Sequence, residues 1–167
     1  MYTGTALIRR PGPALADGIV THMDRVLVDV DLAVQQWDAY VRAMADNGWD
    51  LVEVPPADEC PDAVFVEDTL VMYRGVAVLT RPGADARKPE VDGVAKVVES
   101  LACPVVRIQG PGTLDGGDVL KVGSTVYVGR GGRTNGEGIR QLRHALEPLG
   151  ATVVAVPVTK VSTSSRR

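Results

Sequence analysis

Two segments of the chain share one pattern of apolar and polar positions. Residues 67–80 and 117–129 each contain two β-rich runs joined by a short turn, Arg74-Gly75 in the first and Gly123-Ser124 in the second. Apolar runs around such a glycine-containing turn predict a β-hairpin. Apolar residues with helical spacing follow each hairpin, at Val91, Val94, Val98 and Leu101 in the first segment and at Ile139, Leu142, Leu146 and Leu149 in the second. An apolar strand follows each helix, so the repeated unit is strand–strand–helix–strand.

The N-terminal third follows the same plan less closely. Residues 6–8 and 51–54 predict strands, and an apolar stripe from Leu32 to Met44 predicts a helix between them. The chain therefore indicates three successive units of one α/β domain over residues 1–161. Residues 162–167 are polar and without periodicity, and we expect a loose tail there.

Several residues are candidates for the ends of these helices. Asp31 is expected to cap the first helix and Gly48 to end it. Thr134 and Glu137 have the spacing of a capping box for the last helix, and Gly150 is expected to follow its end.

Composition excludes several classes of protein. The chain has 167 residues, of which 45% are hydrophobic and 23% charged, with a net charge of −3, which suits one globular domain. The acidic balance argues against a nucleic-acid partner, and no apolar run reaches the ~20 residues that cross a membrane. Two cysteines do not form a disulfide scaffold, so we expect a reducing, cytoplasmic location. His22 and His144 lack metal-ligand spacing and no nucleotide-binding motif is present, so we expect neither a metal nor a cofactor.

Acidic residues and arginines gather in three predicted loops. Residues 61–68 carry Asp62, Glu67 and Asp68, residues 112–118 carry Asp115 and Asp118 beside paired glycines, and residues 129–135 carry Arg133. Carboxylates accept the fixed fork of N–H donors on a guanidinium, and an arginine such as Arg133 or Arg87 could hold a carboxylate. The pattern therefore suits an arginine-like ligand. The alternative is that these acids are ordinary turn residues or a solvated strand edge.

Five motifs of the chain occur together in a known family. They are residues 6–11 (ALIRRP), 65–69 (FVEDT), 80–84 (TRPGA), 112–120 (GTLDGGDVL) and 133–135 (RTN). In this order they resemble the dimethylarginine dimethylaminohydrolases, or dimethylargininases, of the pentein superfamily. The resemblance extends to about Val161. It implies an α/β propeller of ββαβ units around a central site, with about three of five units in this chain.

The same resemblance implies a reaction and the residues that serve it. A cysteine attacks a methylated arginine and a histidine transfers protons, giving citrulline and an amine without a metal or cofactor. Asp115 matches the acid of the catalytic set, which binds the guanidinium. The matches to substrate-binding positions are Asp68 for the guanidinium, Asp62 and Glu67 for contacts near the amino-acid end or its lid, Arg87 and Arg133 for the carboxylate, and Ile19 for the lid loop.

The chain departs from the family pattern after Val161. Thr163 stands where the family has its catalytic histidine, and neither Cys60 nor Cys103 matches the nucleophile, although Cys60 is the better candidate of the two. We therefore expect the chain alone to be inactive. A frameshift with early termination would account for residues 162–167, and reading the genomic DNA would test it. We also expect open propeller edges to promote self-association.

Alternatives to this function remain open at the level of sequence. Within the superfamily they are an arginine deiminase or an amidinotransferase. Outside enzymes, the alternative is a non-catalytic module that binds guanidinium compounds.

Overall fold

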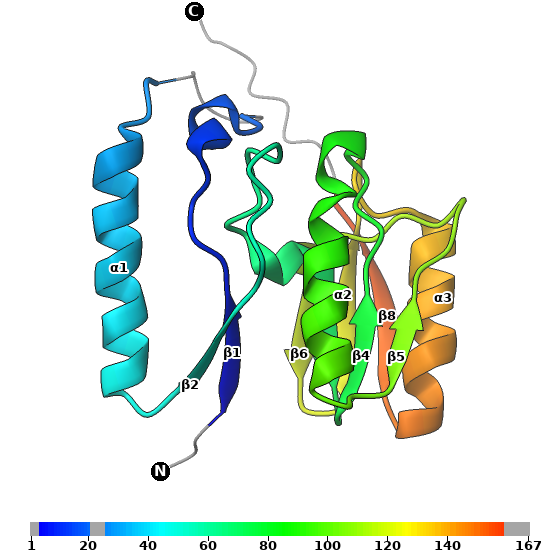
Figure 1. Ribbon diagram of the computed structural model, residues 1–167. Coiled ribbons are helices and arrows are strands. Elements are labelled where there is room, and N and C mark those ends of the chain that lie inside the picture. The colour runs from blue at the N-terminus through cyan, green and yellow to red at the C-terminus, as the bar shows by residue number, and fades with distance from the viewer. Residues whose placement is uncertain (1–3, 21–25, 159–167) are drawn as a thin grey trace, which may run out of the picture.

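Three small sheets stand in a row, with helices packed against them (Figure 1). The structure, a computed structural model, describes residues 4–20 and 26–158, so His22 and the predicted tail 162–167 lie outside it. The strands are β1 (Thr5–Ile8), β2 (Asp50–Glu53), β3 (Leu70–Tyr73), β4 (Val76–Leu79), β5 (Val105–Arg107), β6 (Val119–Val122), β7 (Thr125–Arg130) and β8 (Thr152–Pro157). The helices are α1 (Val30–Asp46), α2 (Glu90–Ser100) and α3 (Gly136–Leu146), with short 3-10 turns η1 (Pro13–Asp17), η2 (Val66–Thr69), η3 (Asp85–Arg87), η4 (Gly116–Asp118) and η5 (Glu147–Leu149).

The two predicted repeats are confirmed as hairpin, helix and parallel strand. β3 pairs with β4 antiparallel, and β5 then pairs with β4 in parallel after α2. β6, β7, α3 and β8 follow the same order with the same pairing. Gly75 and Gly123 have φ of 83° and 59°, a left-handed conformation that glycine adopts without the steric penalty of a Cβ. Before each hairpin, η2 and η4 form a tight turn that carries the acidic residues.

The first unit is simpler than the other two. β1 and β2 pair in parallel around α1, with no hairpin in the described residues. The predicted cap of α1 is wrong, because Asp29 rather than Asp31 accepts the N–H of Leu32, at 2.9 Å. No helix in the described part of the chain is both long and apolar enough to span a membrane.

The cap predicted for α3 is also wrong. Asn135 caps this helix by accepting the Gly138 N–H at 2.8 Å. Thr134 is instead buried, and its hydroxyl donates to Asp118 Oδ2 at 2.5 Å. The predicted end of the helix is confirmed, since η5 follows it and Gly150 has φ of 82°.

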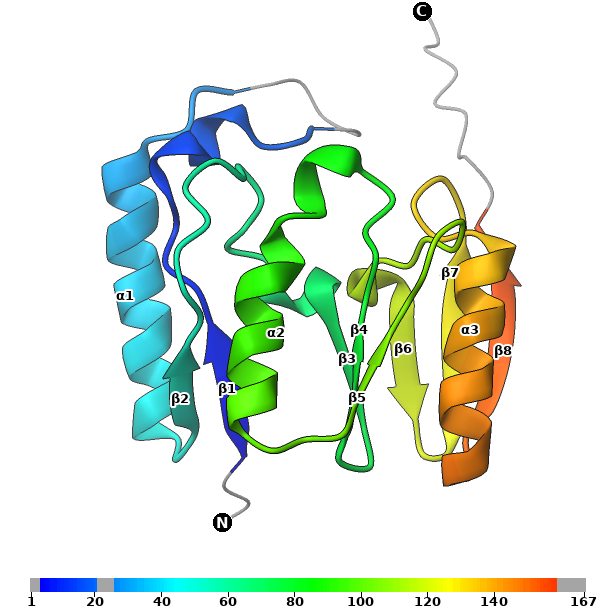
Figure 2. The same cartoon turned by 45° about the vertical axis from the view of Figure 1, so that its right-hand side comes forward.

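Helices α2 and α3 each pack between two sheets. Val91, Val94 and Val98 of α2 share a buried cluster with Val54, which follows β2, and with Leu79 of β4. A second buried cluster joins α3 to the other face of the β3–β4–β5 sheet and to the β6–β7–β8 sheet; its members include Ile139, Leu142 and Leu146 from α3, Val71 and Val78 from the first of these sheets, and Val126, Val128 and Val153 from the second. Figure 2 shows the resulting row, with α1 at one end and β8 at the other.

Candidate functional site

The predicted acids lie where η2 and η4, the corresponding turns of the two repeats, pack against each other. A Cβ added to Gly116 would lie 2.0 Å from the carbonyl oxygen of Glu67, so only glycine permits this contact. The next residue, Gly117, donates its N–H to Asp68 Oδ1 at 2.9 Å. The glycine pair thus brings the two turns together and orients the Asp68 carboxylate.

Asp115 immediately precedes η4 and is almost fully buried, with 2% of its surface exposed. Its Oδ1 accepts the Gly83 N–H at 2.8 Å, and its own N–H donates to the Thr134 hydroxyl at 3.1 Å. Its Oδ2 is buried and has no hydrogen-bond partner. Arg133 Nη1 lies 3.7 Å from this oxygen, within the range of an ion pair but beyond that of a hydrogen bond.

Asp115 and Asp68 share one electrostatic environment. Burial raises the pKa of Asp115 above its ordinary value, and the negative charge of Asp68 raises it further. The hydrogen bond from Gly83 and the charges of Arg133 and Arg87 act in the opposite direction. The charge of Asp68 is therefore close enough to disfavour the ionisation of Asp115, and a cation bound beside Asp115 would relieve this effect.

Arg87 fixes Asp68 from the buried side. Arg87 Nη1 donates to Asp68 Oδ2 at 2.5 Å, while Nε and Nη2 donate to Glu90 at 3.0 and 2.8 Å. Burial opposes the charge of Arg87, but the hydrogen bonds to Glu90 and Asp68 outweigh it and raise the pKa of the guanidinium. Arg87 is therefore a permanent cation with 3% of its surface exposed.

The other predicted site residues surround Asp68 and Asp115 and differ in their exposure to solvent. Asp62 is buried; its carbonyl accepts from Arg87 Nη2 at 3.1 Å, and its carboxylate accepts the N–H of Ile19 at 3.1 and 3.3 Å. Ile19 and Glu67 are exposed, and the Arg133 side chain is 39% exposed. The contacts thus link Ile19 to Asp68 through Asp62 and Arg87.

The sequence of the chain is similar to those of known proteins. No protein-family model matches the chain. The N(G),N(G)-dimethylarginine dimethylaminohydrolase of Streptomyces coelicolor is 62% identical over 161 residues, which cover 96% of this chain and 62% of that protein. The protein of the same name from Pseudomonas aeruginosa is 36% identical, over 93% of this chain and 61% of its own length. Over the matched length, the chain is homologous to the dimethylarginine dimethylaminohydrolases.

Solved structures of dimethylarginine dimethylaminohydrolase share the fold. A mutant of the Pseudomonas aeruginosa protein complexed with citrulline has a TM-score of 0.88 at 36% identity, covering 95% of this chain and 62% of that one. The N-terminal domain of ArgZ, a cyanobacterial arginine dihydrolase, has a TM-score of 0.82 at 19% identity and shows the fold alone. The α/β prediction is confirmed over this length, which is less than two thirds of the family relatives. Closure into five units stays a prediction.

Neither cysteine has the exposed thiol that is expected of a catalytic nucleophile. Cys60 is buried, and burial followed by the nearby charge of Glu90 raises the pKa of its thiol, which disfavours the reactive thiolate. Cys103 is partly buried beside the cluster under α2. His144 is exposed on α3, and the described residues contain no group of three side chains that could hold a metal ion.

Three polar residues of this site were missed at the level of sequence. Glu90 is fully buried and holds Arg87, Thr134 joins Asp115 to Asp118, and Arg9 donates to the Glu90 carbonyl at 2.8 Å. An acid in the first turn of a helix is common for electrostatic reasons, so nothing in the sequence distinguishes Glu90. Thr134 could have been found from its place inside the RTN motif, had capping not explained it first.

Proposed function

We propose that the site around Asp68 and Asp115 binds the guanidinium group of a methylated arginine, as part of a hydrolase that converts it to citrulline and an amine. One observation carries this proposal: Asp115 Oδ2 is a buried carboxylate oxygen without a donor. An unsatisfied buried acceptor costs about 1–3 kcal/mol, more when charged, and a bound donor would recover that energy.

The donor that suits these acids is planar and cationic. Gly83 holds Oδ1 of Asp115 and Gly117 holds Oδ1 of Asp68, so both carboxylates are oriented before a ligand arrives. A guanidinium offers N–H groups in a fixed fork and a positive charge between two acids that repel each other. The Arg133 guanidinium, 3.7 Å from Asp115 Oδ2, supports this choice of chemical group.

The arginines suit the other end of the ligand. Arg133 is half exposed, so its side chain is free to turn from Asp115 to a ligand carboxylate when the ligand guanidinium takes its place. Arg87 is fixed by Asp68 and Glu90 and would act on the ligand carboxylate through its positive charge. We assign Asp62, Glu67 and Ile19 to the approach around the amino-acid end, in keeping with the family resemblance.

The reaction follows from the family resemblance and needs groups beyond this site. A cysteine thiolate bonds to the guanidinium carbon, and the amine leaves with a proton that a histidine donates. Water then attacks the thiouronium, which releases citrulline and regenerates the thiolate. Asp115 would hold the cationic carbon group in place through both steps. Since Cys60 is buried with a raised pKa, we propose that this chain binds the ligand without turnover.

Calorimetric titration with Nω,Nω-dimethylarginine tests the proposal. The wild-type chain should bind it, and Asp115→Asn should weaken binding at least tenfold, because a neutral amide replaces the buried acceptor. Asp46→Asn, at the exposed end of α1, is the matched control and should bind as the wild type does. Equal affinity of Asp115→Asn and the control would contradict the proposal. Citrulline formation by the wild-type chain would contradict the absence of turnover.

Competition between methylated and unmethylated arginine distinguishes the proposed function from an arginine deiminase. An arginine deiminase site would prefer unmethylated arginine, whereas the proposed site should bind the methylated compound at least as tightly. A second candidate function is a non-catalytic module that binds guanidinium compounds. The burial of Cys60 favours this candidate. If a version of the chain extended to the length of its relatives binds methylated arginine and forms no citrulline, that alternative replaces the hydrolase.

A further inference from the structure

The loop that precedes α3 runs beside the loop that carries Asp115. The Asn135 N–H donates to the Thr113 carbonyl at 3.1 Å, and the Thr113 N–H donates to Asn135 Oδ1 at 3.1 Å. Two residues further along, the Asp115 N–H donates to a side chain, the Thr134 hydroxyl, at 3.1 Å. The hydroxyl of Thr134 therefore extends the pairing of the two loops as far as Asp115.

The Thr134 hydroxyl has a second contact that fixes its direction. Thr134 is 0% exposed, and its O–H donates to Asp118 Oδ2 at 2.5 Å. A carboxylate oxygen can only accept, so Asp118 takes the hydroxyl proton and leaves the Thr134 oxygen to accept from Asp115. The Asp118 N–H in turn donates to the Asp115 carbonyl at 3.1 Å. The three residues thus form a closed ring of hydrogen bonds around η4.

The carboxylate of Asp115 needs such support. Its Oδ2 is buried without a hydrogen-bond partner, so the side chain would gain energy by turning toward any donor within reach. The Gly83 N–H holds Oδ1 at the end of the side chain, and the ring with Thr134 and Asp118 holds the backbone at its base. A binding group held at both points is oriented before the ligand arrives, which lowers the cost of binding.

We propose that Thr134 is a positioning residue of the guanidinium site, and that its hydroxyl orients Asp115 while Asp118 orients the hydroxyl. This role rests on the proposed function, because it concerns the carboxylate to which we assign the ligand guanidinium. Thr134 acts through Asp115 and needs no contact of its own with the ligand. Its neighbour Arg133, which we assign to the other end of the ligand, is the alternative route for any effect of residue 134.

Two pairs of variants isolate the hydroxyl. Thr134→Val removes it from the wild-type side chain with little change of volume. Thr134→Ser and Thr134→Ala form a second pair that differs by the same hydroxyl, and neither of them adds volume to the packed site. Thr152→Val, at the exposed start of β8, is the matched control. Circular dichroism with thermal unfolding verifies the fold of each variant, and the second pair carries the test alone if Thr134→Val does not fold.

Calorimetric titration with Nω,Nω-dimethylarginine measures the effect on binding. Thr134→Val and Thr134→Ala should each bind about tenfold more weakly than the chain of their pair that keeps the hydroxyl. The control should bind as the wild type does. Equal affinities within the pair of Thr134→Ser and Thr134→Ala would overturn the proposal.

A ligand without the amino-acid end separates the two routes. N,N-dimethylguanidine should show the same loss of affinity in Thr134→Val and Thr134→Ala, because the effect acts through Asp115. A loss that is confined to the complete amino acid would place the effect on Arg133 instead, and it would overturn the proposal.

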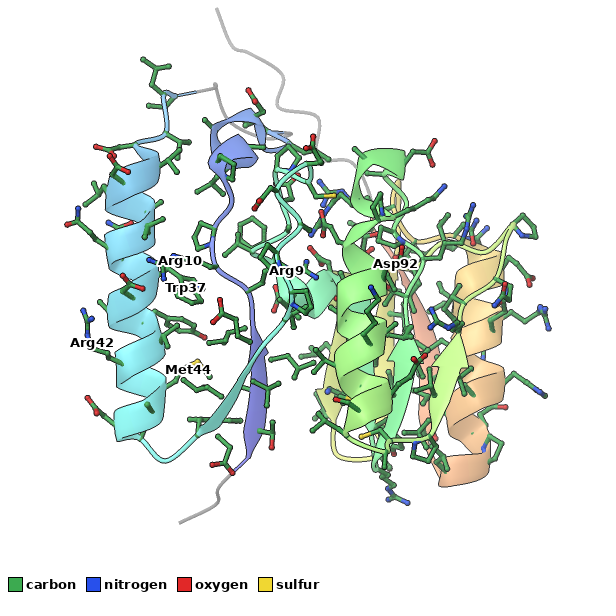
Figure 3. All side chains as sticks on the ribbon, in the orientation of Figure 1. Arg9, Arg10, Trp37, Arg42, Met44 and Asp92 are labelled. Atoms are coloured by element: carbon green, nitrogen blue, oxygen red, sulfur yellow. The ribbon has the colours of Figure 1, made fainter. Side chains whose placement is uncertain are left out.

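The amide proton of Gly83 reports the orientation of Asp115 without any ligand, since it donates to Oδ1. Its NMR resonance should move upfield in Thr134→Val and Thr134→Ala, as this hydrogen bond weakens, and should stay in place in Thr134→Ser. The amide of Arg42, whose side chain points away from the sheets on α1 (Figure 3), is the reference and should not move. A Gly83 resonance that is the same in all the variants would overturn the proposal.

The NMR measurement also keeps this role distinct from the proposed function. If the wild type does not bind methylated arginine while the Gly83 resonance follows the hydroxyl, the proposed function fails and the hold of Thr134 on Asp115 stands. If the wild type binds and neither the affinity nor the Gly83 resonance follows the hydroxyl, the proposed function stands and the role of Thr134 fails.

Discussion

At the residue scale, the carboxyl group of Asp115 opposes folding when it is ionised. Burial raises its pKa above the ordinary value of 3.8, and the charge of Asp68 adds to the effect. The folded chain therefore holds this proton more tightly than the unfolded chain does. Stability from this group is present below pH 3.8 and is lost as the pH rises through the folded-state pKa.

The change Asp115→Asn should therefore stabilise the chain near neutral pH, although it weakens ligand binding at least tenfold. Asn retains an oxygen for the Gly83 N–H but carries no charge. Thermal unfolding should show a melting temperature at or above that of the wild type at neutral pH, with the difference shrinking toward pH 3.8. Asp46→Asn should show no such trend. A variant that is less stable than the wild type only at neutral pH would contradict this sign.

At the scale of elements, the site depends on a close approach of two turns. The carbonyl of Glu67 occupies the space where a Cβ of residue 116 would lie, at 2.0 Å. The contact sets the position of η4 against η2, and with it the positions of Asp115 and Asp68. Gly132, in the loop before α3, has no atom within 4 Å of its Cβ position.

Gly116→Ala should lower the free energy of unfolding by about 1–3 kcal/mol, the usual cost of forcing extra volume into a packed contact. Gly132→Ala is the matched control and should stay within about 0.5 kcal/mol of the wild type. Urea unfolding of the two variants measures the difference. Equal stabilities would mean that the turns do not pack as described.

The elements were predictable because each has a local signature, whereas the polar contacts were not. Hairpins and helices followed from Gly75 and Gly123 and from the spacing of apolar residues. Asp29 and Asp31 are equally good caps by composition, as are Thr134 and Asn135, and only the tertiary contact of Thr134 with Asp118 decides the second case. The acidic residues could be assigned to one site from the sequence, because they occur at the start of the hairpin in each repeat.

The buried ion pair was beyond the reach of the sequence. Arg87 and Glu90 are three residues apart, a spacing that usually marks a solvated pair. Here the Arg87 and Glu90 side chains are 3% and 0% exposed, so the pair is a buried support for Asp68. Burial depends on how the units pack together, so it cannot be predicted from the neighbouring residues in the sequence.

At the scale of the whole molecule, the site belongs to the junction of two repeats rather than to either one. Asp68 comes from the turn before the second sheet and Asp115 from the turn before the third, and Gly117 and Gly83 cross the junction to orient them. The proposed ligand site therefore requires both repeats, and neither repeat alone would contain it.

The most direct test of this account follows the amide resonances of Gly83 and Gly117 by NMR. These two groups donate to Asp115 and Asp68, so each reports on one carboxylate. During titration of the isotope-labelled chain with Nω,Nω-dimethylarginine, both resonances should shift together and give one dissociation constant, while uncharged citrulline shifts them less. Resonances that move with different dissociation constants, or that do not move at millimolar ligand, would show that the two acids do not form one guanidinium site.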